Sequence, residues 1–410
     1  MTRTIAPETS PTPGSTEVRA RHLGLALLTL AIGGFAIGTT EFVTMGLLPD
    51  IAAGVGVSIP QAGHVISAYA LGVVVGAPLL AYFGAGLPRR SLLVGLMAVY
   101  ALFNLVSALA PGFASLTVAR FVDGLPHGGY FGVASLVAAE LAPVGRKGRA
   151  VASVMLGLSV ANVVGVPAAT WLGQSLGWRW AYVSTAFLAL VTVALVLWFV
   201  PRCPADPDSS GRRELSGFRS PQVWLTLLAG AIGFGGMFAV MSYVAPLVTD
   251  VAGLSHRAVP VFLLVFGLGM VFGTWTAGRL ADWSVLRSLL ASALGLALAL
   301  LAFGLVIPYG WVAIGPAFAV TTIGSVLVVN LQLRLMDVAG HAQTLGAAMN
   351  HASLNVANAL GAWLGGVVIA AGFGYVSTAY VGAVLSVAGF SVVLLSAMLA
   401  LRARRAQWSR

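Results

Sequence analysis

Two long apolar stretches of this 410-residue sequence contain ionisable side chains whose types and spacing could support chemistry. Glu41 stands in the segment GTTEFVTMGLLPD, and Arg120, Asp123 and His127 stand in the segment ARFVDGLPHGGYFG. The last three are spaced i, i+3 and i+7, which places them on one face of a helix. Burying an unpaired charge in apolar surroundings is costly, so each of these groups needs a partner or a function.

Glu41 has the chemistry best suited to carrying a proton. A carboxyl that is partly withdrawn from water can gain and lose a proton near neutral pH. We therefore predict that Glu41 is a proton-carrying acid. The alternative is a structural role, in which this glutamate lies near a membrane interface and only hydrogen-bonds a neighbouring helix.

The second segment combines a fixed charge with groups that titrate. Arg120 cannot lose its proton in a protein. It can therefore pair with a carboxylate that is ionised, and it releases that carboxylate once the carboxylate is protonated. Asp123 is either such an exchanging group or a permanent partner that neutralises the arginine. His127 can relay protons, although a lone histidine in a helix is more often only hydrogen-bonded. Pro126 is expected to kink the helix beside this cluster.

The composition shows what kind of structure must hold these residues. Hydrophobic residues make up 59% of the chain and charged residues 8%, and the mean hydropathy is +0.95. A soluble domain is about a quarter charged, and a disordered chain needs low hydrophobicity. Both classes are therefore excluded, and the chain is an integral membrane protein.

The sequence lacks motifs for several other kinds of chemistry. Cys203 is the single cysteine, and the six histidines show no metal-binding spacing. There is no GxxxxGKS or GxxxxGKT loop for a nucleotide. The net charge of +10 is spread between apolar runs instead of forming one basic face for nucleic acid. We predict no metal, cofactor, nucleotide or nucleic-acid partner, and no enzymatic activity.

Twelve apolar runs are long enough to cross a bilayer, whose hydrocarbon core of about 30 Å requires about 20 helical residues. They fall at 23–47, 61–84, 91–110, 114–140, 150–173, 180–200, 222–247, 259–280, 288–307, 311–333, 344–370 and 376–401. We predict an all-α membrane protein with two bundles of six helices. The predicted domains are an N-terminal tail (1–22), a first bundle (23–200), a linker (201–221), a second bundle (222–401) and a C-terminal tail (402–410).

The distribution of basic residues predicts how the helices are oriented. If the N-terminus is cytoplasmic, 19 of the 22 lysines and arginines fall in cytoplasmic segments. Only Arg179 and Arg257 fall in outer loops, and Arg120 lies inside a helix. Because Lys and Arg collect on the cytoplasmic side of membrane proteins, we predict that both tails and the linker are cytoplasmic.

The two halves of the sequence also resemble each other. The segment LGVVVG at 71–76 aligns with LGMVFG at 268–273, and at the same offset RSLL at 90–93 aligns with RSLL at 287–290. Six helices per repeat give the two repeats the same orientation in the membrane. Parallel repeats of this kind are typical of transporters that have a central cavity between two bundles.

Aromatic, amide and thioether side chains within the predicted spans suit a pocket for an amphiphilic organic molecule. The candidate substrate-binding residues are Tyr69, Tyr130, Asn162, Phe234, Phe238, Met241, Asn350, Asn355 and Asn358. Each asparagine is alternatively a clasp between helices that contributes about 0.6 kcal/mol. Each apolar side chain is alternatively part of a packed core.

Small residues recur at every fourth position of one predicted helix. The series runs from Ser153 through Gly157 and Gly165 to Gly177. Small residues at this spacing let two helix backbones approach closely. We interpret this series as a packing surface.

Four segments together carry a family resemblance. They are GTTEFVTMGLLPDIA at 38–52, ARFVDGLPHGGYFGVA at 119–134, ANVVGVPAATWLGQSLGWR at 161–179 and the stretch that ends in GAWLGG at 361–366. The chain resembles the major facilitator superfamily, specifically its drug:proton antiporter branch, which includes chloramphenicol-efflux and arabinose-efflux proteins. The resemblance implies alternating access, with Glu41 as the proton-carrying acid and Arg120 as the arginine of the coupling site.

One loop departs from the pattern of that family. The acidic and basic signature between the second and third helices reads AYFGAGLPRR here, so an alanine replaces the acid while Arg89 and Arg90 remain. The second repeat keeps more of the signature, as Gly278, Arg279 and Asp282. We therefore expect Asp282 to anchor a cytoplasmic gate.

A second departure concerns the direction of transport. The antiporter signature has a glycine directly before a proline, whereas Val166 separates Gly165 from Pro167 here. We predict a monomeric, proton-coupled transporter of the cell membrane that exports small organic compounds such as chloramphenicol. Its partners would be the substrate, protons and the lipid bilayer. The alternative is the same fold transporting a sugar, a nucleoside or another metabolite.

Overall fold

The computed structural model describes residues 13–202 and 210–408, and the regular secondary structure within these ranges is entirely helical. Predictions that concern residues 1–12, 203–209 and 409–410, among them Cys203, lie outside the described residues. The predicted N-terminal tail is partly helical, because the first helix begins at Pro13.

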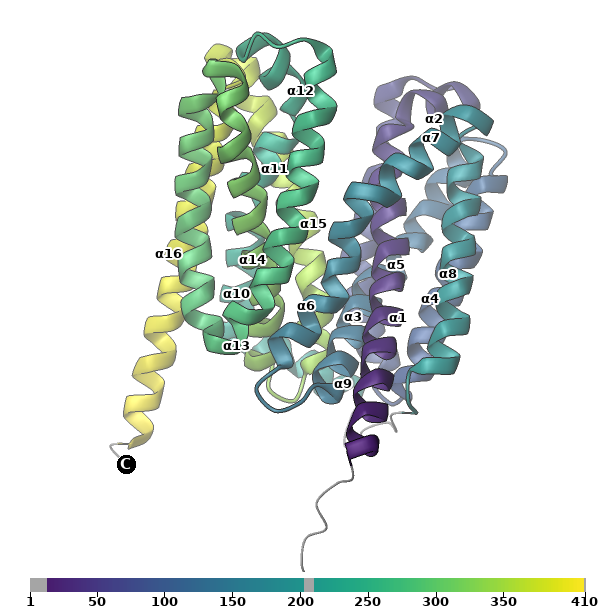
Figure 1. The fold of residues 1–410 in the computed structure, drawn as a ribbon, viewed down its shortest axis with the longest axis vertical. Helices are drawn as coiled ribbons and strands as arrows, with labels where there is room; N and C mark the ends of the chain where they lie inside the picture. Colours follow the sequence, from purple (N-terminus) through teal and green to yellow (C-terminus); the bar gives the residue numbers. More distant parts are fainter. Residues whose placement is uncertain (1–12, 203–209, 409–410) are drawn as a thin grey trace, which may run out of the picture.

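The elements before the linker form one bundle of helices (Figure 1). They are α1 (Pro13–Gly46), α2 (Leu48–Val55), α3 (Ile59–Gly84), α4 (Arg89–Leu109), α5 (Phe113–Leu141), α6 (Lys147–Val160), the π-helical turn η1 (Ala161–Gly165), α7 (Val166–Leu176) and α8 (Arg179–Phe199). Local chemistry defines their ends. At the start of α3 the Ser58 hydroxyl accepts the backbone N–H of Gln61 at 3.4 Å, and the Gln61 side chain accepts the backbone N–H of Ser58 at 3.2 Å.

The predicted span at 150–173 is interrupted by a wide turn. It consists of α6, η1 and α7 in succession. Pro167 lacks a backbone N–H, and its ring conflicts with the carbonyl four residues earlier in a regular α-helix. The π-helical turn over Ala161–Gly165 immediately precedes this proline and provides the extra room.

The elements from the linker onward form the second bundle. They are α9 (Gly211–Leu215), η2 (Ser216–Arg219), α10 (Pro221–Gly233), α11 (Gly235–Met241), α12 (Val244–Pro246), η3 (Leu247–Val251), η4 (His256–Ala258), α13 (Val259–Val306), η5 (Ile307–Ala313), α14 (Ile314–Val338), α15 (Gln343–Val368), η6 (Ile369–Phe373) and α16 (Ser377–Trp408). Helix α13 is broken at Ser284, where the backbone is extended (φ −169°, ψ 108°). The helix therefore supplies two spans, as the two runs at 259–280 and 288–307 predict.

Within the described ranges, nine helical stretches are long and apolar enough to cross a membrane. One of them, Val259–Val338, has 80 residues and contains three spans, because it is divided at Ser284 and again at Gly310. Helix α5 adds a further span of 29 residues that contains Arg120 and Asp123. The prediction of twelve membrane helices in two bundles is confirmed.

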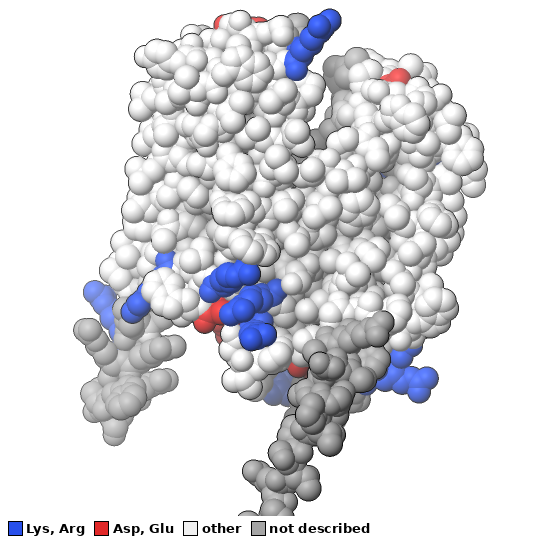
Figure 2. Space-filling view, viewed as in Figure 1, with Lys and Arg blue, Asp and Glu red and all other residues white. Residues whose placement is uncertain are grey.

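Apolar cores fill both bundles. Met97, Tyr100 and Phe131 are buried in the first core. Phe262 and Phe303 are buried in the second core, which extends to Met155 of α6. The outer surface in Figure 2 is uncharged over most of its height, with charges near the two ends, and many large apolar side chains of the described chain are exposed. An exposed apolar surface of this extent is expected where a protein faces lipid.

The two bundles touch at one end of the molecule and separate at the other (Figures 1 and 2). The start of α1 and the end of α16 lie at the end where the bundles touch, which we call the termini end. We call the opposite end the open end. At the termini end Ala77 of α3 packs with Ala348 and Ala352 of α15, which closes the space between the bundles.

Candidate functional site

A cavity of about 60 Å³ lies between the two bundles. Glu41 and Asn162 line it from the first bundle. The second bundle contributes several other predicted substrate-binding residues, namely Phe234, Phe238, Met241, Asn355 and Asn358. Further apolar lining comes from Phe42, Met155, Leu158, Met237, Met270, Val328, Val329 and Leu354. Most of the wall can therefore contact rings and methylene groups. The lining side chains that can form hydrogen bonds are Glu41, Ser159, Asn162, Thr274, Ser325, His351, Asn355 and Asn358.

Glu41 is the one carboxyl among the residues that line this cavity. No described side chain forms a hydrogen bond or an ion pair with it. The guanidinium of Arg120 acts on it electrostatically but does not lie within ion-pair distance. A carboxyl in this position can bind or release a proton without first breaking a bond to the protein.

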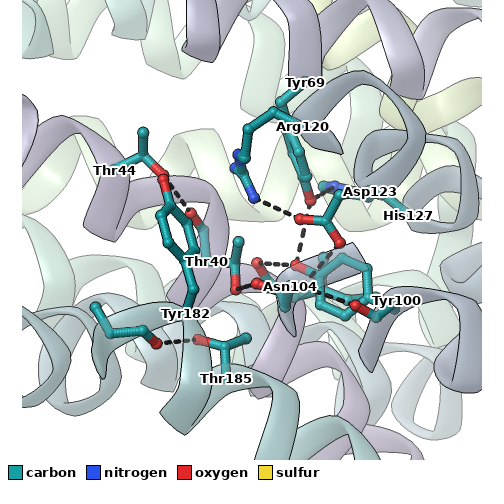
Figure 3. Close-up of polar contacts among 12 residues, drawn as sticks. Thr40, Thr44, Tyr69, Tyr100, Asn104, Arg120, Asp123, His127, Tyr182 and Thr185 are labelled. Carbon is teal, nitrogen blue, oxygen red and sulfur yellow. Dashed lines mark hydrogen bonds and ion pairs between the residues drawn. The ribbon is translucent and has the colours of Figure 1, made fainter. Parts of the chain in front are cut away.

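Arg120 is paired with Asp123 in the middle of the first bundle (Figure 3). Both side chains are buried, with relative exposures of 1% and 0%. The guanidinium carbon lies 4.3 Å from the ring centroid of Tyr69 and 5.2 Å from that of Tyr182. Ring faces attract a cation, so the arginine is held by one carboxylate and by two aromatic rings.

The second oxygen of Asp123 is also bonded. It accepts a hydrogen bond from Asn104 Nδ2 at 2.8 Å, and Asn104 Oδ1 accepts one from the Thr40 hydroxyl at 3.1 Å. This arrangement satisfies the carboxylate on both sides and keeps it away from the cavity lining. Sequence analysis did not single out Asn104, although an amide within the apolar run at 91–110 was a signal that could have found it.

A second chain of hydrogen bonds crosses from one bundle to the other. The Tyr69 hydroxyl lies 2.9 Å from His127 Nδ1, and His127 Nε2 lies 3.1 Å from His351 Nδ1 on α15. Sequence analysis also missed His351, an ionisable residue within the run at 344–370. The run shows that the histidine is unusual, but not that it meets His127, because the two are 224 positions apart.

Three candidate substrate-binding residues lie outside the cavity lining. Tyr69 is directed toward His127 in the first bundle. Tyr130 is buried and donates a hydrogen bond from its hydroxyl to the Leu30 carbonyl oxygen at 3.0 Å. Asn350 is 1% exposed, and neither end of its amide has a hydrogen-bond partner in the described chain.

Asp282 joins the two bundles at the termini end. Its carboxylate accepts the backbone N–H of Gly148 at 2.6 Å and Nε of Arg149 at 2.8 Å. Gly278 lies against the same part of α6, where an added Cβ would come within 2.8 Å of the Arg149 Cα. A weaker contact joins Lys147 Nζ to Asp337 Oδ1 at 3.4 Å.

The other predicted gating residues make contacts within their own bundle. Arg89 forms an ion pair with Glu140, and Arg90 donates to the Leu197 carbonyl. Arg279 lies over the ring of Trp275, 3.8 Å from its centroid. Gly165 faces Thr39 and Phe35 of α1, and Pro167 is the second residue of α7. In this conformation Asp282 and Gly278 lie at the contact between the bundles, and Arg89 lines a pocket there with residues of the loop before α15.

The described residues contain no group of three or more His, Cys, Asp or Glu side chains that could hold a metal ion.

Comparisons with known proteins define the family. The Major Facilitator Superfamily pattern matches residues 30–350. The chain is 40% identical over 375 residues to the inner membrane transport protein YdhP of Escherichia coli, covering 90% of this chain and 95% of that one. It is 39% identical over 262 residues to a chloramphenicol resistance protein of Streptomyces lividans, covering 63% and 67%. The solved proton:xylose symporter XylE superposes with a TM-score of 0.75 at 17% identity, covering 91% and 95%.

This chain belongs to the major facilitator superfamily. It is therefore a multi-pass membrane transporter of small molecules and not an enzyme. The likeness to XylE shows the shared fold.

Proposed function

We propose that this transporter exports small organic compounds in exchange for protons. The observation that carries the proposal is the position of Glu41, a single carboxyl without a bonded partner in the described chain, on the wall of a largely apolar cavity. A cavity of this kind can hold either a proton on the carboxyl or a substrate beside it. Competition between the two is what an exchange mechanism requires.

Asp123 has a different role in this proposal. Its carboxylate is fully buried and bonded to Arg120 and Asn104, so it has no route to the cavity in this conformation. Arg120 thereby remains a neutralised fixed charge near Glu41. The ionised form of Glu41 must be regenerated in every cycle when the proton leaves.

The character of the cavity supports an amphiphilic substrate. Rings and thioethers of Phe234, Phe238, Met237 and Met241 make up much of the second-bundle wall. A sugar carries many hydroxyl groups, each of which loses free energy if it is desolvated without a partner. The alternative substrates, namely sugars, nucleosides and other polar metabolites, would leave many such groups unpaired against this wall. The similarity to a chloramphenicol resistance protein supports a drug-like substrate.

The proposed orientation places the termini end in the cytoplasm. In the view of Figure 2, more basic side chains lie at that end than at the open end, as the positive-inside rule requires. The structure would then represent the outward-facing state, in which a proton from outside reaches Glu41. A proton entering down a potential of 100 mV supplies about 2.3 kcal/mol, and each pH unit adds about 1.4 kcal/mol.

The test uses inside-out vesicles with an acid interior and a pH-sensitive dye. Chloramphenicol, further drugs and a set of sugars are added to vesicles that contain the wild type, Glu41→Gln or the control Asp250→Asn, which removes an exposed carboxylate of η3. We expect a drug to dissipate the gradient in the wild type and in the control but not in Glu41→Gln.

Two results would contradict the proposal. An equal response of Glu41→Gln would show that the coupling acid lies elsewhere. A response to sugars with none to drugs would favour the alternative substrate class.

A further inference from the structure

His351 presents an unbonded nitrogen at the wall of the cavity. The residue is 2% exposed and lines the cavity beside Asn355 and Asn358 on the same helix. Its Nδ1 is bonded to His127, whereas its Nε2 has no hydrogen-bond partner in the described chain. A buried polar atom without a partner costs free energy, so its retention calls for a function.

The ring of His351 is held in one orientation. It stacks on Phe131, with 4.2 Å between the ring centroids and an angle of 14° between the planes. Nδ1 lies 3.1 Å from Nε2 of His127 in the first bundle. Because the two nitrogens lie on different sides of an imidazole, this bond fixes Nε2 on the side away from His127.

The hydrogen-bond chain behind His351 determines whether Nε2 carries a proton. The Tyr100 hydroxyl donates to the Ile37 carbonyl oxygen at 3.3 Å, so Tyr100 is not a donor to Tyr69. Tyr69 lies 3.4 Å from the Tyr100 oxygen but 2.9 Å from His127 Nδ1. A buried hydroxyl needs an acceptor for its proton, and of these two atoms only His127 Nδ1 lies at a normal distance for one. We therefore assign Tyr69 as the donor to His127 Nδ1.

The tautomers of both histidines follow from this step. A neutral imidazole carries one proton, and a ring whose Nδ1 accepts must carry its proton on Nε2. His127 therefore donates from Nε2 to His351 Nδ1, and His351 in turn carries its proton on Nε2. The chain from Tyr69 thus presents an N–H donor at the cavity wall.

Few other donors on this wall are held in one direction. The amides of Asn162 and Asn355 each donate one N–H to a carbonyl oxygen of their own helix at 3.0 Å, so the second N–H and the oxygen of each amide are left for other partners. The hydroxyls of Ser159 and Thr274 are bonded to each other at 2.8 Å. A ligand that carries an acceptor oxygen therefore has a distinct partner in His351.

We infer that His351 Nε2–H is the hydrogen-bond donor that anchors an acceptor oxygen of the substrate, such as a carbonyl or nitro oxygen. The remainder of the substrate would lie among Phe234, Phe238 and the neighbouring methionines. The inference rests on the proposed function for the existence of an organic substrate in this cavity. It does not depend on Glu41 being the proton carrier.

Binding to the purified full-length protein tests the inference with two probes. Chloramphenicol carries nitro and carbonyl acceptors, whereas tetraphenylphosphonium carries no acceptor. His351→Leu removes the donor at similar volume, His351→Gln keeps an N–H donor, and His341→Gln is a control in the exposed turn before α15.

We expect His351→Leu to weaken chloramphenicol binding about three- to tenfold, as for the loss of one hydrogen bond. Tetraphenylphosphonium binding should change less than about twofold, because that probe makes no such bond. His351→Gln and the control should bind both probes like the wild type. Equal losses for both probes in His351→Leu, or no loss for either, would overturn the inference.

A second measurement does not depend on any ligand. Nitrogen-15 NMR of protein labelled at histidine distinguishes a ring nitrogen that bears a proton from one that does not, and the signal lost in His351→Gln identifies His351. A protonated Nε2 with an unprotonated Nδ1 supports the inference, and the reverse overturns it. If neither probe binds to the wild type, drug export loses support while the NMR result still decides the tautomer.

Discussion

Among individual residues, the pair of Arg120 and Asp123 shows how this protein holds a charge deep within the membrane. The arginine has a carboxylate on one side and the rings of Tyr69 and Tyr182 beside it. The carboxylate is satisfied in turn by the amide of Asn104. Removing one member of a buried pair leaves an uncompensated charge, which is far costlier than removing both members.

We expect Asp123→Asn to destabilise the folded protein by about 3–5 kcal/mol, because it leaves Arg120 buried without a counter-charge. Thermal unfolding in detergent measures the change. The double variant Arg120→Gln with Asp123→Asn should recover part of the loss, and the exposed Asp250→Asn should unfold like the wild type. If the Asp123→Asn variant proves as stable as the Asp250→Asn variant, Asp123 does not neutralise Arg120 in the folded state.

The sequence indicated which residue types are unusual but not which of them meet. Glu41 and Arg120 stand out because a charge in an apolar run is rare, and the structure places Glu41 on the cavity. The partners Asn104 and His351 come from other helices, and no spacing along one helix can reveal a contact across two. Tyr130 looked equally suited to a pocket, but the direction of its hydroxyl toward Leu30 depends on packing.

At the scale of helices, the fourfold series of small residues makes one close contact possible. Gly157 and Gly165 of the α6–α7 segment lie directly against Ala31, Phe35 and Thr39 of α1. Because α1 carries Glu41 and η1 carries Asn162, this contact positions two residues of the cavity wall. Hydropathy predicted both spans well, whereas the π-helical turn between α6 and α7 left no signal in the apolar pattern.

Gly157→Ala is expected to destabilise the protein by about 1–3 kcal/mol, as for other overpacked contacts. A methyl group at Gly157 would overlap the carbonyl oxygen of Ala31, and neither backbone can move without disturbing its helix. Gly95→Ala on α4 is the matched control, because nothing lies within 4 Å of an added Cβ there. Thermal unfolding compares the two variants, and equal melting temperatures would show that the α1–α6 contact tolerates a wider separation.

At the scale of the whole molecule, the two bundles meet through apolar side chains, such as Ala77 with Ala348 and Met155 with the second core, and through a small set of polar contacts. The polar contacts that cross between them run from His127 and His351 in the interior to Asp282 at the termini end. A transporter that alternates between inward-open and outward-open states must break such contacts and form others at the opposite end. Asp282 is the best placed of them to control this step, since it is 8% exposed and accepts two hydrogen bonds from α6.

We expect Asp282→Asn to shift the population toward a state that is open at the termini end by about fivefold, which corresponds to about 1 kcal/mol. The amide keeps one acceptor oxygen but loses the charge that attracts Arg149. Spin labels at the exposed positions Val144 and His341, in a Cys203→Ser background, report the distance between the bundles at this end. Asp282→Asn should add a longer distance to the distribution measured by pulsed electron spin resonance.

Asp337→Asn is the matched control for this measurement. It removes the same charge from a neighbouring contact between the bundles, but the pair of Lys147 and Asp337 is about half exposed, at 45% and 49%, and its atoms are 3.4 Å apart. Exposed pairs contribute about 0–1 kcal/mol, so the distance distribution should stay close to that of the wild type. If both variants give the same distance distribution, the termini end is held closed by apolar packing such as that of Ala77 and Ala348. The contacts of Asp282 then do not keep this end closed.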